Sequence, residues 1–156
     1  MQEFSVLSAD ERPYLYVKVA TDYDNLGREV AKGFADLTKF MDDNRIHPRG
    51  LPLTVLPDRP TELFRIQVGC IVAKDDLAQA RGDIHAGALP AGRSVHCSFR
   101  GHYSDFPGLY AAMVEYGHRQ GHMMARTTWQ YLYKLPEGRP LEQIDYECHY
   151  ALREVG

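Results

Sequence analysis

The chain has 156 residues, of which 44% are hydrophobic and 11% aromatic, enough to bury one sizeable core in a single domain. Its formal net charge of -3 excludes the strongly basic surface that nucleic-acid backbones require, so we expect no direct nucleic-acid partner. Residues 1–19 include acidic side chains and no long apolar run, and no apolar stretch elsewhere is long enough to span a membrane. We therefore expect no signal peptide and no membrane contact, and we place the protein in the cytoplasm.

The first predicted element is the strand "YLYVKVA", in which Leu15, Val17 and Val19 alternate with more polar residues. A helix follows, capped by Asp24 or Asn25 and ending near residue 44. Its apolar residues step by three and four: Leu26, Val30, Phe34, Leu37 and Met41. Two more alternating stretches, near 51–55 and 64–72, predict strands joined in a hairpin by a Pro-rich turn. The first unit is therefore predicted to be βαββ.

A second unit follows at an offset of 80 residues. Leu15 falls on Val95, and "DRPTELF" at 58–64 falls on "GRPLEQI" at 138–144. The equivalent elements are a strand at 95–99, a helix from 106 to about 120, and strands at 126–133 and 144–152. We predict one α+β domain over 1–156, built from two βαββ repeats at about 14–72 and about 93–153 with a connector at about 73–92.

Each helix must bury its apolar stripe against the apolar face of its own last strand. The opposite face of the strands then carries a polar set: Tyr16, Lys18, Arg65, Gln67, Gly69, His96, Ser98, Arg100, Asp145, Glu147 and His149. If the repeats pack about a pseudo-twofold axis, their antiparallel sheets flank a central groove lined by these groups. A groove between repeats is a normal place for a small ligand.

Three segments of the second unit resemble the GyrI-like small-molecule-binding family: "LPAGRSVHCSFRGHYSDFPGLYAAM", "TTWQYLY" and "IDYECHYAL". That family includes stand-alone gyrase-inhibitory proteins and the effector-binding domains of AraC-type and MerR-type multidrug regulators. The resemblance covers nearly the whole chain and implies two βαββ units with a ligand groove between them. It implies an acidic groove residue at Glu147 and a Pro-Ala-Gly entry at 90–92. Gln130 stands after Trp129 where the family often has Glu, which leaves cation selectivity open at that position.

The expected ligand is a small organic molecule, aromatic or cationic and lipophilic, bound without a covalent step. Glu147 would attract a cation and the aromatic rings would add cation–π attraction, unless Glu147 is simply solvated. Trp129, Tyr131 and Tyr133 share one strand face that corresponds to Leu51 and Leu53, so at least one is expected under the helix. Gln130, on the opposite face, is then the better groove residue. The predicted ligand-binding residues are Glu147, Gln130, Trp129, Tyr131, His149, His96, Arg65, Gln67, Tyr16 and Tyr103, the last of which has a structural alternative.

Two other functions remain open from the sequence. One is a hydrolase acting on a reactive small molecule, with Glu147 and either His149 or His96 activating a water near neutral pH. The other is a protein-binding role like that of gyrase inhibitors. Only thirteen residues precede Tyr14, too few for a helix-turn-helix, so we expect a stand-alone protein. The sequence does not fix the oligomeric state.

No cofactor or metal is predicted. His118 and His122 have the i, i+4 spacing of a helical metal pair, but Gly117 and Gly121 indicate that the helix ends there. The three cysteines lack CxxC spacing and stand in apolar alternating runs, so we expect free thiols in the core.

Overall fold

The structure is a computed structural model that describes residues 2–22, 24–56, 64–101, 103–134 and 144–154. Its helices are α1 (Leu26–Asp43) and α2 (Phe106–Arg119), with 3-10 turns η1 (Lys74–Gln79) and η2 (Tyr103–Asp105). Its strands are β1 (Ser5–Ala9), β2 (Arg12–Thr21), β3 (Pro52–Leu56), β4 (Phe64–Ile71), β5 (His85–Leu89), β6 (Gly92–Arg100), β7 (Met124–Leu132) and β8 (Asp145–Leu152). The predicted α+β class is confirmed. The Arg-Pro segments at 58–63 and 138–143 lie outside the described residues.

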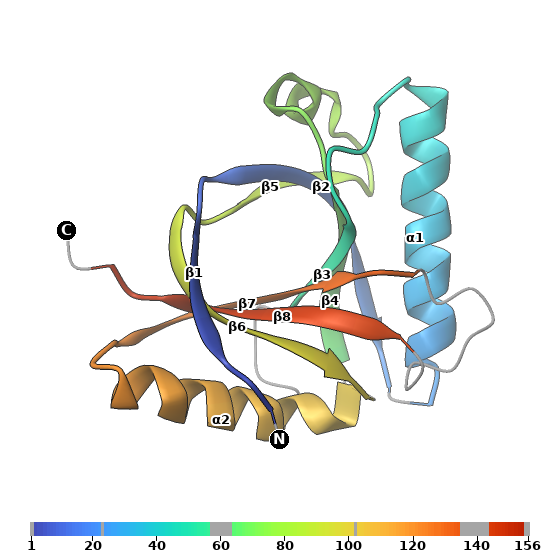
Figure 1. Cartoon of the computed structure of the whole chain (residues 1–156). Helices are drawn as coiled ribbons and strands as arrows, with labels where there is room; N and C mark the ends of the chain where they lie inside the picture. Colours follow the sequence, from blue (N-terminus) through green and yellow to red (C-terminus); the bar gives the residue numbers. More distant parts are fainter. Residues whose placement is uncertain (1, 23, 57–63, 102, 135–143, 155–156) are drawn as a thin grey trace.

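All the strands join one antiparallel sheet in the order β1-β6-β8-β7-β3-β4-β2-β5. The sheet curls, and both helices lie on its outer side (Figure 1). Helix α1 packs on β2 and β4, while α2 packs on β6, β7 and β8. Only residues 10 and 11 separate β1, at one edge, from β2, next to the other edge. Three Cα steps span at most about 11 Å, so the curl brings the two edges close together at this end.

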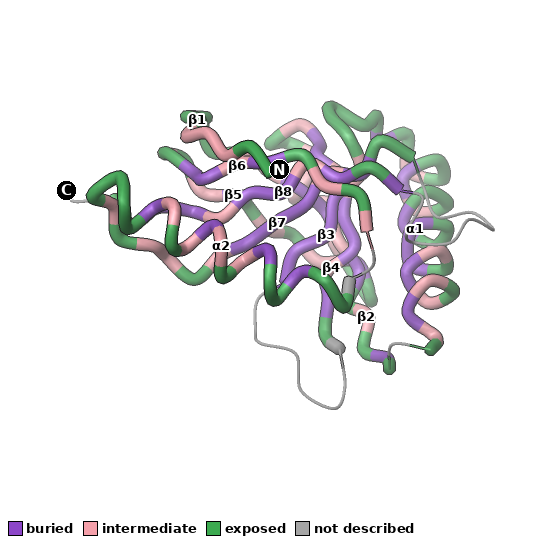
Figure 2. The backbone as a smooth tube through the Cα atoms, turned by 60° about the horizontal axis from the view of Figure 1, so that its bottom comes forward, coloured by how far each residue is buried: buried purple, intermediate pink, exposed green. Residues whose placement is uncertain are grey.

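The main hydrophobic core fills the space between the sheet and the two helices. It is formed by one alternate set of strand residues together with the buried helix residues, including Leu15, Val68, Phe34, Phe106 and Cys148. A smaller cluster lies on the other face of the sheet and contains Tyr14, Leu53, Val55, Ile71, Leu89, Trp129 and Ala151. Figure 2 shows the buried residues concentrated in the central strands β3, β4, β7 and β8. We call the helix-free face the inner face.

The helices follow the predicted pattern closely. The predicted stripe of α1 is buried, and its residues are Leu26, Val30, Phe34, Leu37 and Met41. Helix α2 ends at Arg119 because Gly121 takes a φ of +81°, a left-handed conformation that terminates helices. His122 therefore lies beyond the helix, and it does not share a helix face with His118.

Strand pairing keeps the offset of 80 in two pairs of strands. Tyr16 pairs with Gly69 between β2 and β4, and His96 pairs with His149 between β6 and β8. The offset is different in the remaining pair, because Leu53 pairs with Gly69 whereas Trp129 pairs with His149. Position 129 in β7 is thus equivalent to position 53 in β3. The predicted correspondence at a constant offset of 80, which matched the stretch from Trp129 to Tyr133 with Leu51 and Leu53, is therefore wrong. A register shift between Met124 and Thr128 accompanies this difference.

Strands β1 and β5 were not predicted. The stretch treated as a connector, about 73–92, contains η1 and β5, and the residues ahead of Tyr14 contain β1. The two strands occupy the opposite edges of the sheet, and they too stand 80 residues apart: Ser5 pairs with His96, and His85 pairs with Tyr16. Each edge strand thus pairs with the half of the chain to which it does not belong.

The described residues contain no helix that is both long and apolar enough to cross a membrane. The three cysteines are free thiols, as predicted; Cys97 and Cys148 are buried and Cys70 is half-buried.

Candidate functional site

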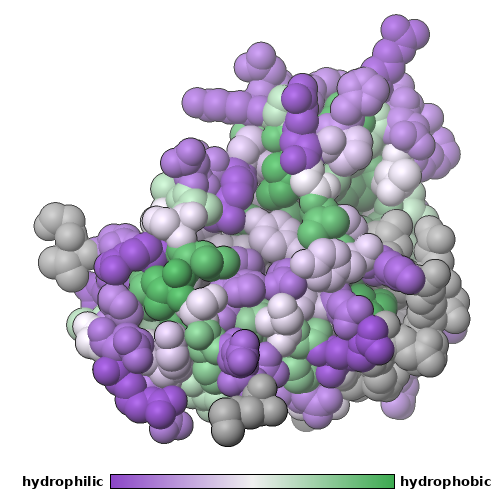
Figure 3. Space-filling view, in the orientation of Figure 1, coloured by the Kyte–Doolittle hydropathy of each residue, from purple (hydrophilic) through white to green (hydrophobic). Residues whose placement is uncertain are grey.

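The candidate site lies on the inner face of β6, β7 and β8. Side chains that face each other across neighbouring strands point to the same side of a sheet. Trp129 pairs with His149, Tyr131 with Glu147, and His149 with His96, so these five predicted residues are brought together. In Figure 3, hydrophilic side chains surround a central area where hydrophobic and weakly polar side chains are visible over the curled sheet.

The first part of the site is the Glu147 cluster, formed by Glu147, His96, Ser98 and Tyr133. The Ser98 hydroxyl donates to the Glu147 carboxylate at 2.9 Å, and the Tyr133 hydroxyl donates to the same oxygen at 2.8 Å. His96 Nε2 contacts the other carboxylate oxygen. Only 18% of the Glu147 side chain is exposed. The structure therefore places Glu147 among hydrogen-bond donors. The alternative prediction, that Glu147 is simply exposed to solvent, is wrong.

These donors keep Glu147 ionised. Burial alone would raise the pKa of this carboxyl group, but hydrogen bonds from His96, Tyr133 and Ser98, with the His96 charge, hold the pKa below its usual value. The hydrogen bond between Tyr133 and Glu147, and to a lesser extent burial, raise the pKa of the Tyr133 hydroxyl. The cluster is thus a carboxylate whose oxygens already accept hydrogen bonds from three side chains.

The second part is the Trp129 cluster, formed by Trp129, His149, Tyr131 and Arg12. The indole ring of Trp129 and the imidazole ring of His149 are parallel within 3°, with centroids 5.2 Å apart. The Tyr131 ring meets His149 edge-on at 5.5 Å. Trp129 is 2% exposed, and it also belongs to the smaller hydrophobic cluster of the inner face.

His149 is buried and neutral. Burial, and then the positive charges of His96 and Arg12, lower its pKa to about 3. Its Nδ1 forms a 2.9 Å hydrogen bond with the Ser94 hydroxyl. The expectation that His149 could exchange protons near neutral pH is therefore wrong, because a cation at this place would lose its hydration shell.

Arg12 is the member of the cluster that the sequence analysis missed. It begins β2, yet its guanidinium lies over the Trp129 ring with Cζ 5.3 Å from the centroid. It donates to the Tyr131 hydroxyl oxygen and to the Pro90 carbonyl, each at 3.0 Å. These contacts join β2 to β7 and to the link between β5 and β6, so no local pattern around Arg12 could have revealed them.

Gln130 lies on the face of the sheet that packs against the helices, opposite the inner face. The prediction that Gln130 is a groove residue is therefore wrong. The Gln130 side chain is buried on the helix side, where it accepts a hydrogen bond from the Thr54 hydroxyl at 2.6 Å and donates to the Tyr110 hydroxyl of α2. Trp129 and Tyr131 take the inner face because they neighbour His149 and Glu147 in the sheet. Gln130 consequently does not line the same surface as Glu147.

In the first half, Gly69 is the equivalent of His149 at the offset of 80, and the Tyr14 side chain fills the space over it. Its ring lies against two glycines: a Cβ added to Gly69 would come within 3.0 Å of the ring, and one added to Gly87 within 2.9 Å. Burial, with a smaller effect from Tyr16, raises the pKa of the Tyr14 hydroxyl to about 12. At the offset of 80, Glu147 and His96 correspond to the uncharged residues Gln67 and Tyr16 in the first half.

The remaining predicted residues lie around this filled half. The Tyr16 ring lies beside the His85 ring, tilted by 30° with centroids 5.3 Å apart, and Gln67 accepts a hydrogen bond from the Tyr14 hydroxyl. Arg65 is exposed. The side chain of Tyr103 lies outside what the structure describes. No group of three or more His, Cys, Asp or Glu side chains gathers as a metal site within the described ranges.

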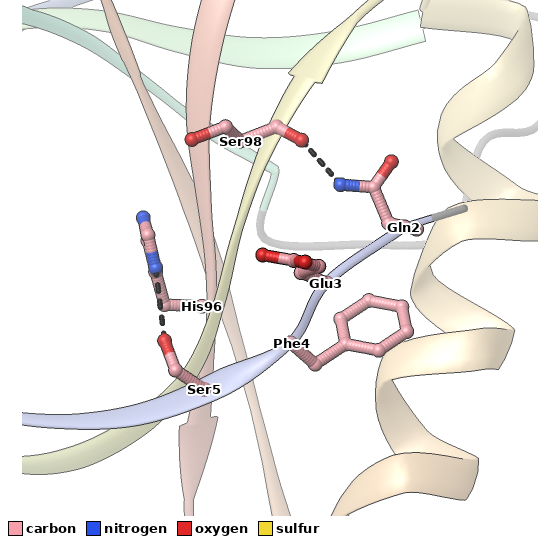
Figure 4. Close-up of a pocket in the computed structure, with 6 residues that line it drawn as sticks. All are labelled: Gln2, Glu3, Phe4, Ser5, His96 and Ser98. Atoms are coloured by element: carbon pink, nitrogen blue, oxygen red, sulfur yellow. Dashed lines mark hydrogen bonds between the residues drawn. The ribbon is translucent and has the colours of Figure 1, made fainter.

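A pocket of about 410 Å³ opens beside the Glu147 cluster, lined by Gln2, Glu3, Phe4, Ser5, His96 and Ser98. Figure 4 shows the Ser5 hydroxyl directed at His96 and the Gln2 amide at the Ser98 carbonyl. Residues 2–5, which lead into β1, therefore form one wall of this pocket, and His96 and Ser98 of the Glu147 cluster form another.

Comparison with known proteins establishes the fold. No family model matches the chain, and no curated protein sequence matches it. The C-terminal domain of EcmrR has a TM-score of 0.68 at 12% identity, with 99% of both chains covered. A hydrolase encoded by lin2189 from Listeria innocua has a TM-score of 0.64 at 12% identity, covering 97% of this chain and 92% of that one. SAV2435 bound to tetraphenylphosphonium has a TM-score of 0.58 at 8% identity, covering 97% and 94%.

EcmrR in its complex with DNA has a TM-score of 0.74 at 10% identity. That match covers 99% of this chain but 58% of the EcmrR chain, so the chain spans a little over half of the length of EcmrR. The chain described here therefore has the fold of a domain that also occurs within a larger protein.

Proposed function

We propose that this chain binds a small organic molecule with an aromatic part, non-covalently, on the inner face next to Glu147 and Trp129. The observation that carries the proposal is the juxtaposition of the Trp129 cluster with the Glu147 cluster. It offers aromatic rings, a carboxylate and a guanidinium within one surface, the mixture typical of ligand sites.

The architecture that we propose for this site is two repeats about a pseudo-twofold axis, within one domain over 1–156. The equal pairing of β2 with β4 and of β6 with β8 supports it, as does the matched pairing of β1 and β5. Thr54 pairs with Gln130 between β3 and β7, at positions equivalent in the two halves, so the axis would pass between these two residues. The inner face of both halves would then form one groove.

We further propose a relation to the GyrI-like family. The likeness to the EcmrR C-terminal domain supports the shared fold. SAV2435 is bound to tetraphenylphosphonium, a lipophilic cation, which fits the ligand class expected from the resemblance. A cation bound here would have to compete with Arg12 for Trp129 and with three hydrogen-bond donors for Glu147.

A hydrolase is the second candidate, and the Glu147–His96 contact favours it because a carboxylate and an imidazole in contact can activate a water. A structure with this fold from Listeria innocua is described as a hydrolase. Against it, the neutral His149 leaves only His96 as the imidazole partner. The binding proposal predicts that ligands recovered after prolonged incubation are unchanged by mass spectrometry. Turnover that is abolished in Glu147→Gln would favour the hydrolase.

The binding proposal is tested by fluorescence, because Trp129 is the only tryptophan. We expect a saturable change of its emission on titration with an aromatic probe, uncharged benzyl alcohol or cationic tetraphenylphosphonium. For the cation, Glu147→Gln should weaken binding by roughly 1–3 kcal/mol, the scale of a charge-assisted contact. The control Glu154→Gln removes a carboxylate that pairs with Arg93 and should leave binding unchanged. No saturable change with either probe, and no heat by calorimetry, would contradict small-molecule binding.

A further inference from the structure

Arg12 carries a positive charge that no carboxylate of the described residues neutralises by an ion pair. Its three hydrogen bonds go to uncharged oxygens: the Asp10 carbonyl at 2.8 Å, the Tyr131 hydroxyl and the Pro90 carbonyl. Two arginines of β6 do have carboxylate partners. Arg93 pairs with Glu154 and Arg100 pairs with Asp145, both on exposed surface. A half-buried guanidinium without a counter-charge is costly, so the place of that charge is open to a ligand.

The ring beneath Arg12 carries a buried donor without an acceptor. The indole Nε1 of Trp129 is buried, and it has no hydrogen-bond partner among the described residues. A buried N–H group without an acceptor costs about 1–3 kcal/mol relative to one that is bonded, so native proteins rarely retain one. The guanidinium lies over the same ring that carries this N–H group.

Tyr131 adds to the same excess of donors. Its hydroxyl oxygen accepts the hydrogen bond from Arg12, which leaves its own hydrogen to donate. Glu147 does not supply the missing acceptor, because its oxygens are engaged by His96, Ser98 and Tyr133 and it forms no ion pair with Arg12. The acceptor that completes the Trp129 cluster must come from outside the described residues.

We infer that the Trp129 cluster binds the carboxylate group of an aromatic ligand, and that Arg12 is the residue that sets this preference for an anion. This inference rests on the binding function proposed above and names its ligand class. A planar carboxylate fits the fork of a guanidinium with two parallel hydrogen bonds, and the rings of Trp129, Tyr131 and His149 receive the aromatic part. The flexible aliphatic stem of Arg12 allows the guanidinium to move off the indole while it keeps contact with the bound anion.

The test compares two probes of similar size and opposite charge, phenylacetate and phenethylammonium, by selective excitation of Trp129. The wild-type protein should bind phenylacetate roughly ten- to a hundredfold more tightly, the factor expected for a hydrogen bond to a charged group. In Arg12→Gln this preference should disappear through weaker binding of phenylacetate. Arg12→Lys keeps the positive charge but lacks the planar guanidinium that donates two parallel hydrogen bonds, so it should retain part of the preference for phenylacetate.

A matched control is Arg81→Gln, because the Arg81 guanidinium also lies over an aromatic ring, 5.2 Å from the centroid of Phe40 on α1. This variant should bind both probes as the wild-type protein does. Tighter binding of phenethylammonium by the wild type, or an unchanged preference in both Arg12 variants, would overturn the anion inference and leave the proposed binding function standing. Binding of neither probe by the wild type would overturn both.

Discussion

Glu147 and His149 are neighbours on one strand, yet their surroundings lead to opposite charge states. Glu147 remains ionised because three side chains donate hydrogen bonds to it, whereas His149 remains neutral because it is buried beside positive charges. Folding therefore keeps a proton off each of them, and this makes the stability of the protein depend on pH.

His149 controls this dependence below neutral pH. In the unfolded chain its pKa is near 6.5, and in the folded protein it is about 3, so below pH 6.5 the unfolded state binds the extra proton. Stability should therefore fall by up to about 1.4 kcal/mol for each pH unit as the pH drops from 6.5 to 5. Urea unfolding at several pH values should show a smaller slope for His149→Gln. The control His118→Gln, at the exposed end of α2, should keep the wild-type slope; equal slopes for all three proteins would contradict the assignment.

Most members of the site could be predicted from sequence because strand alternation assigns residues to faces. Glu147, His149 and His96 were correctly placed together by their alternation with apolar neighbours. Gln130 was placed on the wrong face because Leu53, the equivalent used to orient this strand, was expected to pack under a helix, whereas Leu53 lies in the cluster on the inner face. Arg12 was missed because its partners stand on β7 and before β6, and only the curl of the sheet brings them near.

Among the elements, the short edge strands were the hardest to predict. Strands β1 ("SVLSA") and β5 ("HAGAL") have five residues each, and small or polar residues replace a clear apolar alternation. Their pairing partners β6 and β2 lie far along the chain, so local pattern carries no information about them. The long helix α1 and strands β2, β4, β6 and β8 have strong periodicity and were predicted within a few residues.

Strand β5 has a glycine at position 87 because the Tyr14 side chain occupies the space that a Cβ would need. The three atoms nearest to an added Cβ there all belong to the Tyr14 ring, whereas at Gly69 the nearest is the Leu15 carbonyl oxygen, at 2.9 Å. Gly87→Ala and Gly69→Ala should each destabilise the protein by about 1–3 kcal/mol through overpacking. In double-mutant cycles by urea unfolding, Tyr14→Leu should relieve most of the Gly87→Ala cost but little of the Gly69→Ala cost. Equal relief in both cycles would show that the ring alone sets the limit at both glycines.

At the scale of the whole molecule, the two halves are joined by exchange of their edge strands. Strand β1 pairs with β6 and β5 pairs with β2, so a half cut from the other loses the strand that covers its edge. An uncovered edge strand exposes a row of backbone donors and acceptors.

This exchange predicts the behaviour of a split protein. A cut between Arg81 and Gly82, both exposed, leaves every described strand intact. Fragments 1–81 and 82–156 should associate one to one when co-expressed, and neither alone should unfold cooperatively. Size-exclusion chromatography and circular dichroism measure both properties. Cooperative unfolding of either fragment by itself would show that the halves are independent.

The position of β1 has a consequence for the order of events during synthesis. Strand β1 leaves the ribosome before β6, whose residues Gly92 to His96 are made some 83 to 91 positions after the residues they pair with. Strand β1 must therefore wait with its backbone unpaired until these residues have been translated. Contacts between residues this far apart in sequence form slowly, because a long loop has to close first. The wall that Ser5 contributes beside His96 is consequently completed only after the second half has begun to fold, so the nascent chain acquires its pocket late.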